Sequence, residues 1–241
     1  MNKKEILQNN FDKNGYVVVK NFLPNKDIKD VKTSLHNYIK KNFKKLKGRD
    51  IAKIKNNSIS SIHNLKKWQY VKKLQNTNKV KNLAKTILRE KIKKFGSELF
   101  AKPAKIGLPA PIHQDNHYWH LNDGKGITIW IALDHSNKKN GAVFYFEKSH
   151  MVGLLEHKLS NVKGLSQELK NKEILKFFRK KTPTLKPGDA LIHSCMIIHG
   201  SNQNRSGNNR MGLTMRFISA KSKFNLFSKK KYDQDLKRIN K

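Results

Sequence analysis

Two short segments carry the residues that could bind a metal ion. In the first, His113 and Asp115 stand two positions apart, and such positions in a strand face the same side, so both side chains would point into one cavity. The second is the run 190–198, which leads to His199. Two histidines and one carboxylate can hold iron(II) and leave three positions open for a bidentate oxo-acid and oxygen. We therefore predict that these three residues form a catalytic, mononuclear iron site.

An arginine follows the second segment at a distance that suits an oxo-acid. Arg210 lies eleven residues after His199, at the start of a strand-like run. Its guanidinium group could bind the distal carboxylate of 2-oxoglutarate through two parallel hydrogen bonds, which a lysine could not do as well. Arg216 has the same strand parity if no bulge intervenes, so the sequence leaves two candidates for this contact.

Helices are predicted mainly in the first 95 residues. Residues 15–23 form an apolar, β-branched run that predicts a short strand. Residues 47–65 are polar and rich in Ser and Asn, which predicts a long loop, and the pattern of residues 79–94 predicts a helix. Between the strand and the loop, apolar residues recur at spacings of three and four, as an amphipathic helix requires: Ile28, Val31, Leu35 and Tyr38.

From about residue 96 the chain changes to short strand-like runs separated by turn signals. Many short strands at this spacing indicate a sandwich or a jelly-roll barrel. Residues 166–181 read as a helical insertion between them. The predicted strands are 97–103, 111–119, 127–134, 142–147, 183–186, 189–194, 196–199 and 210–220.

We expect the 241 residues to form a single domain, because all-β domains of this length are common. Residues 1–95 would provide the N-terminal strand and helices, 96–220 the core with an insertion at 150–181, and 221–241 a basic tail. No apolar stretch reaches the roughly 18 to 20 residues that cross a bilayer, and no signal core is present, so we expect a cytoplasmic protein. The single cysteine, Cys195, excludes an intramolecular disulfide and a cysteine-built metal site.

The net charge is the most conspicuous feature of the composition. The chain has 52 Lys and Arg against 17 Asp and Glu, a formal charge of +35. Clustered basic residues would indicate a nucleic-acid partner, but here they are spread along the whole chain among many Asn residues. Lysine- and asparagine-biased coding would give the same picture, which argues against that partner. An anionic small substrate suits the charge better. Both a monomer and a homodimer remain open.

The chain resembles a known family, the phytanoyl-CoA dioxygenase family of iron(II)/2-oxoglutarate oxygenases. The resemblance covers roughly residues 10–220. One motif departs from the family pattern, because this chain has Lys148-Ser149-His150 where the family usually has Gly-Ser-His. The motifs that carry the resemblance follow the family's order and spacing. They are residues 15–23, His113-Gln114-Asp115 with Tyr118, 129–134, Asn140-Gly141, 148–150, 186–189, and His199-Gly200-Ser201 with Asn204, Ser206 and Arg210.

The resemblance implies a double-stranded β-helix (a jelly-roll, cupin-like core) with flanking helices, and iron bound by His113, Asp115 and His199. It implies Fe²⁺, 2-oxoglutarate and O₂ as cofactor and co-substrates, with ascorbate as a supporting reductant. The carboxylate of Asp115 favours hydroxylation, because related halogenases lack it and bind chloride there. The residues implied to bind 2-oxoglutarate are Arg210 and Ser201 at the far carboxylate, with help nearer the metal from Lys102, Gln114, Thr128 and Trp130.

We therefore expect a hydroxylase that acts on an aliphatic carbon of a small, anionic molecule of unidentified structure. Two alternatives stay open: an oxygenase of nucleic-acid bases or other macromolecules, and a non-catalytic jelly-roll binding protein. The lysine-rich segments 47–65 and 150–181 would form a lid. His117 would face the cavity if the strand of His113 ran on. The remaining histidines are expected to be structural or surface groups: His120, His135, His150, His157 and His193.

Overall fold

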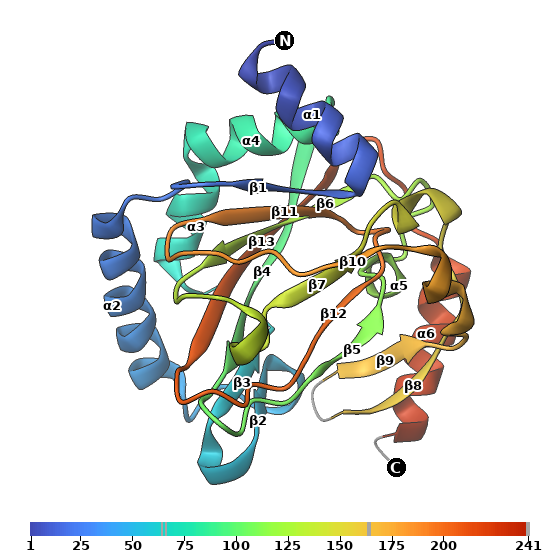
Figure 1. Ribbon diagram of the computed structural model, residues 1–241. Helices are drawn as coiled ribbons and strands as arrows, with labels where there is room; N and C mark the ends of the chain where they lie inside the picture. Colours follow the sequence, from blue (N-terminus) through green and yellow to red (C-terminus); the bar gives the residue numbers. More distant parts are fainter. Residues whose placement is uncertain (64, 66, 163–164, 240–241) are drawn as a thin grey trace.

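The computed structural model describes residues 1–63, 65, 67–162 and 165–239, and two antiparallel sheets form its centre (Figure 1). The larger sheet has the strand order β1-β11-β6-β13-β4-β3-β2, and the smaller has the order β10-β7-β12-β5. The hairpin β8-β9 packs beside β5. The strands are β1 (Tyr16–Val19), β2 (Ile51–Lys53), β3 (Ile59–Ile62), β4 (Ile92–Lys102), β5 (Ala110–His113), β6 (Gly126–Ala132), β7 (Val143–Phe146), β8 (His157–Val162), β9 (Leu165–Leu169), β10 (Lys180–Lys181), β11 (Ala190–Ser194), β12 (His199–Ser201) and β13 (Arg210–Ser219).

Helices α2, α3 and α4 cover the outer face of the seven-stranded sheet, and their apolar residues share one core with it. Helix α6 lies at the other side of the molecule, next to the hairpin β8-β9 (Figure 1). The helices are α1 (Lys3–Asn14), α2 (Asn25–Asn42), α3 (Gln69–Asn76), α4 (Asn78–Leu88), α5 (Asn116–Trp119) and α6 (Leu226–Ile239), with short 3₁₀ turns η1 (Gly48–Asp50), η2 (Lys55–Asn57), η3 (Lys138–Asn140), η4 (Ser149–Val152) and η5 (Glu173–Phe177).

The alternation of side chains along β6 separates the core from a cavity between the sheets. Ile127, Ile129 and Ile131 pack under the helices, whereas Thr128 and Trp130 face the cavity. A shift of one residue in the register of this strand would exchange the two sets, so the hydrophobic pattern fixes the register. Strands β4 and β13 alternate in the same way, with Leu99, Leu213, Met215 and Phe217 in the core and Glu98, Phe100, Lys102, Arg210, Thr214 and Arg216 at the cavity.

Several predictions from the sequence are confirmed. The first predicted strand is β1, and the amphipathic helix is α2, whose buried residues are the four expected from their spacing: Ile28, Val31, Leu35 and Tyr38. The mainly β fold with two facing antiparallel sheets and flanking helices is the predicted jelly-roll class.

Three strand predictions in the second half are wrong. The run 111–119 is no single strand, because β5 ends at His113 and the short helix α5 begins at Asn116. The buried side chain of Asn116 accepts from the backbone N–H of Leu121 and donates to its carbonyl, which closes this turn. Residues 183–186 contain only an isolated bridge, and in the run 196–199 only His199 belongs to a strand.

Three predictions of helix and loop also need correction. The segment 47–65 contains the paired strands β2 and β3, which extend the large sheet. In the segment 79–94, α4 ends at Leu88, because Arg89 adopts the left-handed conformation and β4 follows. The expected helix over 166–181 is instead β9, a 3₁₀ turn and β10. There, pairing with neighbouring strands overrides the helical spacing of the apolar residues.

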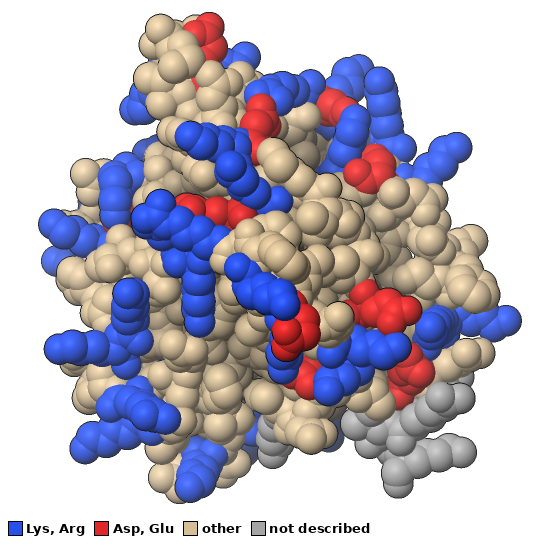
Figure 2. Space-filling model, turned by 45° about the vertical axis from the view of Figure 1, so that its right-hand side comes forward, with Lys and Arg blue, Asp and Glu red and all other residues tan. Residues whose placement is uncertain are grey.

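The basic side chains are distributed over the surface and do not form one patch on the face drawn in Figure 2. Uncharged surface and Asp and Glu side chains separate the Lys and Arg residues there. Much of the basic tail forms α6. Within the part of the chain that the structure describes, no helix is both long and apolar enough to cross a membrane.

Candidate active site

The three predicted metal ligands lie together at one end of the cavity. His113 ends β5, His199 begins β12, and the two are direct partners in the antiparallel ladder, with ring centroids 4.3 Å apart. The Asp115 Oδ1 atom is 3.6 Å from Nε2 of His113 and 3.7 Å from Nε2 of His199. One ligand atom from each residue falls within 4.8 Å of the others, a spacing that one metal ion can span. Asp115 reaches this point because the chain turns after β5, not by strand parity.

Backbone contacts orient both imidazole rings toward the common point. The Nδ1 atom of His113 donates to the Pro111 carbonyl at 2.8 Å, and that of His199 donates to the Ile197 carbonyl at 3.0 Å. A carbonyl oxygen can only accept, so Nδ1 carries the proton and the Nε2 lone pair is free to bind a metal. Burial, and the nearby His113, lower the pKa of His199 to about 3, so its ring is neutral at physiological pH.

Asp115 is held through one of its two oxygens. Oδ2 accepts hydrogen bonds from the Thr128 hydroxyl at 2.9 Å and from His193 Nε2 at 3.1 Å. His193 in turn accepts from the Tyr145 hydroxyl at 3.0 Å. Burial alone would raise the pKa of Asp115, but the surrounding side chains of His113, His193 and His199 hold it well below its usual value. The carboxylate is therefore ionised, with Oδ1 left for a metal ion.

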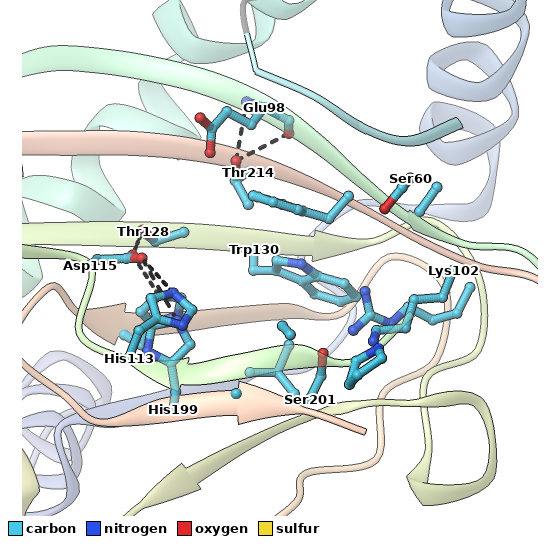
Figure 3. A pocket seen from close by; sticks show the side chains of 18 of the residues that line it. Ser60, Glu98, Lys102, His113, Asp115, Thr128, Trp130, His199, Ser201 and Thr214 are labelled. Carbon is cyan, nitrogen blue, oxygen red and sulfur yellow. Dashed lines mark hydrogen bonds and ion pairs between the residues drawn. The ribbon is translucent and has the colours of Figure 1, made fainter. Parts of the chain in front are cut away.

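The three predicted metal ligands open onto a cavity of about 110 Å³, which has room for more than a single water molecule. Figure 3 shows His113, Asp115 and His199 at one end, Ser201 and Lys102 at the other, and Trp130 between the two groups. Other cavity residues come from both sheets and the loop before β5: Ser60, Glu98, Phe100, Ala101, Leu108, Pro109, Ala110, Thr128, Val143, His193, Gly200, Arg210, Thr214 and Arg216.

Arg210 is a buried cation at the end of the cavity that lies away from His113, Asp115 and His199. Only 2% of the residue is exposed, its Nη2 donates to the Gly141 carbonyl at 2.7 Å, and its Nε has no partner. No Asp or Glu of the described residues lies within ion-pair distance of it. Its guanidinium carbon lies 5.1 Å from the ring centroid of Trp130. The far end of the cavity therefore carries a positive charge that an anion could neutralise.

Arg216, the rival candidate, is already paired. Its Nη1 lies 3.2 Å from Glu98 Oε1, and its side chain packs against the rings of Phe95 and Trp119. The two arginines do share one face of β13, as their parity predicts. Their electrostatic surroundings differ, and only Arg210 offers an unpaired charge to the cavity.

The helper residues named from the sequence divide into two groups. Lys102, Thr128, Trp130 and Ser201 line the cavity, whereas Gln114 does not. Burial, and the neighbouring Arg210, lower the pKa of Lys102 to about 6, and its amino group donates to the carbonyls of Leu108 and Asn202. The side chain of Gln114 is instead bonded to backbone groups of Gly153, Met196 and Leu155.

Of the histidines outside the predicted metal site, His193 lies in the cavity, whereas His117 and His157 pack together outside it. His117 does not face the cavity, because α5 replaces the strand that would have carried it there; its ring stacks on His157 at 4.2 Å. His157 accepts from the Gln114 backbone N–H. His193 was expected to be a structural group, yet it touches Asp115 inside the cavity. The sequence did contain a signal for this contact. His193 is a histidine among apolar residues on the buried strand β11, at a position whose side chain faces the cavity.

Comparison with known proteins shows which family the chain belongs to. The model of the phytanoyl-CoA dioxygenase (PhyH) family matches residues 11–212. The chain belongs to the phytanoyl-CoA dioxygenase family. It is 24% identical over 234 residues to the peroxisomal phytanoyl-CoA dioxygenase of Homo sapiens, covering 87% of this chain and 67% of the relative.

Two solved structures share the fold. EctD from S. alaskensis with bound Fe aligns with a TM-score of 0.76 and 19% identity, over 93% of this chain and 79% of the other. The epimerase SnoN from nogalamycin biosynthesis, in complex with Fe³⁺, alpha ketoglutarate and nogalamycin RO, aligns with a TM-score of 0.74 and 15% identity, over 92% and 86%. The predicted class, a 2-oxoglutarate-dependent non-haem iron oxygenase of this family, is confirmed.

The donor set of this family member fits iron(II). Two imidazole nitrogens and one ionised carboxylate oxygen converge, and the cluster contains no thiolate that would favour softer metals. The second carboxylate oxygen is bonded by Thr128 and His193, which leaves Asp115 a single oxygen for the metal. The unpaired charge of Arg210 at the other end of the same cavity suits the distal carboxylate of 2-oxoglutarate.

Replacing His193 by phenylalanine is expected to weaken iron binding by about 10- to 100-fold, the usual cost of losing a group that orients a metal ligand. The phenyl ring fills similar space, but Asp115 Oδ2 loses one of its two donors. Oxygen-free titration with iron(II) measures the effect. His193→Gln, which keeps an N–H donor, should lose less, and the exposed His135→Ala is the control. Unchanged iron affinity in His193→Phe would rule out the orienting role.

Proposed function

We propose that this chain is an iron(II)- and 2-oxoglutarate-dependent hydroxylase that acts on an aliphatic carbon of a small molecule. The observation that carries the proposal is the joint presence, in one cavity, of a two-histidine, one-carboxylate cluster and a buried arginine without an acidic partner among the described residues. Family membership and the iron- and alpha-ketoglutarate-bound structural neighbours support it.

Each end of the cavity has a separate role in this proposal. His113, Asp115 and His199 would hold iron, and Arg210 with the Ser201 hydroxyl would bind the distal carboxylate of 2-oxoglutarate. When bound, iron and 2-oxoglutarate supply the activation of dioxygen and the removal of a hydrogen atom from the substrate. The protein's contribution is orientation and exclusion of water, for which Trp130 packs between the two ends.

Lys102 and Thr128 have supporting roles. Lys102 is neutral above its pKa of about 6 while the cavity lacks an anion, so Arg210 provides the permanent charge. The amino group of Lys102 donates to two backbone carbonyls and thereby ties the loop before β5 to the segment after β12. Thr128 fixes the unused oxygen of Asp115. We infer that both residues shape the site before 2-oxoglutarate arrives.

The wider context of the enzyme is part of the same proposal. We infer one catalytic domain, acting in the cytoplasm as a monomer or homodimer, with the segments 47–65 and 150–181 around the cavity. The human relative is described as peroxisomal, so location differs within the family under this proposal. The neighbour SnoN is described as an epimerase, so the test of hydroxylation must identify the product.

The proposal is tested by a succinate-release screen over candidate metabolites with iron(II), 2-oxoglutarate and ascorbate. We expect slow succinate formation without substrate and a marked increase with the right one, accompanied by a product heavier by one oxygen atom in mass spectrometry. A product of unchanged elemental composition, or one lacking two hydrogens, would contradict hydroxylation. Absence of iron and 2-oxoglutarate binding in calorimetry would instead indicate a non-catalytic binding protein.

A further inference from the structure

The cavity contains a further charged side chain, which neither iron nor 2-oxoglutarate requires. The Glu98 side chain, on β4, is 13% exposed and lines the cavity. Its Oε1 lies 3.2 Å from Arg216 Nη1 and 3.3 Å from His63 Nδ1. His63 is in turn 2.8 Å from the Ser61 hydroxyl on β3. Three strands thus contribute to one polar network at the cavity wall.

Both contacts of Glu98 use the same oxygen. Within the described part of the chain, no side-chain or backbone donor reaches Oε2. Burial by itself would raise the pKa of Glu98, but Arg216 and His63 lower it, so the carboxylate is ionised. An ionised carboxylate oxygen only accepts hydrogen bonds, so Oε2 is free to accept one from a molecule bound in the cavity that Glu98 lines. A bound molecule with an N–H or O–H group would supply the donor that the described residues do not.

The position of Glu98 places it beside the metal end of the cavity. Arg216 is the cross-strand partner of Thr128, whose hydroxyl bonds to Asp115. Figure 3 shows Glu98 well apart from Lys102 and Ser201, which mark the end proposed for the 2-oxoglutarate carboxylate. A molecule that contacts Glu98 would therefore lie near the iron ligands without displacing the oxo-acid. This is where the carbon to be oxidised must lie.

We propose that Glu98 is the specificity-determining residue for the substrate, and that the substrate presents an ammonium or hydroxyl group to Oε2. The inference rests on the proposed function and narrows its substrate class. The partnership with Arg216 leaves this wall formally neutral, so a neutral alcohol and a cationic amine both fit. A simple hydrocarbon chain or a carboxylate does not fit, because neither offers a donor to Oε2. This differs from the anionic substrate expected from the net charge.

The test compares three small probes of similar size, pentylamine, pentanol and pentanoate, on oxygen-free protein loaded with iron(II) and 2-oxoglutarate. Calorimetry should show that the amine and the alcohol bind the parent at least about tenfold more tightly than pentanoate. Glu98→Gln should remove most of this preference and leave the dissociation constants of iron and 2-oxoglutarate unchanged. Glu173→Gln, at a side chain that is 82% exposed, is the matched control.

The alternative is that the network only joins β3, β4 and β13. The double variant Glu98→Gln/Arg216→Met addresses this, because it removes both charges together and avoids an unpaired buried cation. If Glu98→Gln keeps the parent's preference, or if the parent binds pentanoate as tightly as pentylamine, the proposal is overturned. If Glu98→Gln unfolds but the folded double variant keeps the preference, it is overturned as well. Failure of the parent to bind iron or 2-oxoglutarate would instead refute the proposed function.

Discussion

Replacing Asp115 by alanine is expected to lower iron(II) affinity by more than about 100-fold and to abolish measurable succinate formation. Loss of a group that merely orients a ligand costs about 10- to 100-fold in metal affinity, so loss of a ligand should cost more. Asp115 is also the only carboxylate in the cluster, and the Thr128 and His193 donors that hold it would be left without an acceptor. Iron binding is measured by oxygen-free titration, and succinate by chromatography.

Two comparisons make the result specific to the missing ligand. Asp30→Ala, on the exposed side of α2, should behave like the parent. Added formate can place a carboxylate in the space left in Asp115→Ala, and it should restore part of the iron affinity there. It should not do so in His113→Ala, which lacks an imidazole instead. Turnover of 2-oxoglutarate at the parent rate in either alanine variant would show that the ligands are misassigned.

The convergence of His113, Asp115 and His199 could be predicted from the sequence although part of the reasoning about it was wrong. The interpretation placed His113 and Asp115 on one strand, whereas the chain turns between them into α5. The two side chains still meet because a strand end followed by a turn also brings positions i and i+2 near one point. His199 was placed by its order and spacing in the chain, and its ladder pairing with His113 explains why that spacing works.

Interactions between distant segments could not be predicted in the same way. The contacts of Glu98 with His63 and Arg216 join residues that are far apart in the sequence. The local signal was weak: a single acid in β4, directly before the apolar pair Leu99 and Phe100, in a strand that also carries three lysines. The same limit applies to His193, whose bonds to Asp115 and Tyr145 connect separate strands.

The fold class was predictable because it depends on repeated local patterns. Alternation along β6 and the helical spacing in α2 recur over many residues and agree with one another. Two of the errors fall in the segments 47–65 and 166–181, where short polar strands are stabilised by pairing with neighbours. Pairing partners are a tertiary property, so local propensity cannot identify such strands.

The second large effect is expected at Arg210. On iron-loaded, oxygen-free protein, Arg210→Ala should raise the dissociation constant of 2-oxoglutarate at least about 30-fold, because a buried carboxylate that loses its charged partner costs about 2 to 5 kcal/mol. Iron affinity should be unchanged, since Arg210 is remote from the ligands at the other end of the cavity. Arg210→Lys should give an intermediate value, because it keeps a charge but loses the bidentate geometry. Calorimetry measures all three proteins.

Arg216→Ala is the decisive comparison, because the sequence alone left both arginines as candidates. Arg216 is already paired with Glu98, so its removal should change the 2-oxoglutarate dissociation constant by less than about threefold, while the exposed Arg205→Ala controls for lost net charge. If Arg216→Ala shows the large effect and Arg210→Ala does not, the two roles must be exchanged. The oxo-acid would then lie against Glu98, and the hydrogen-bond acceptor proposed there for the substrate would no longer be accessible to it.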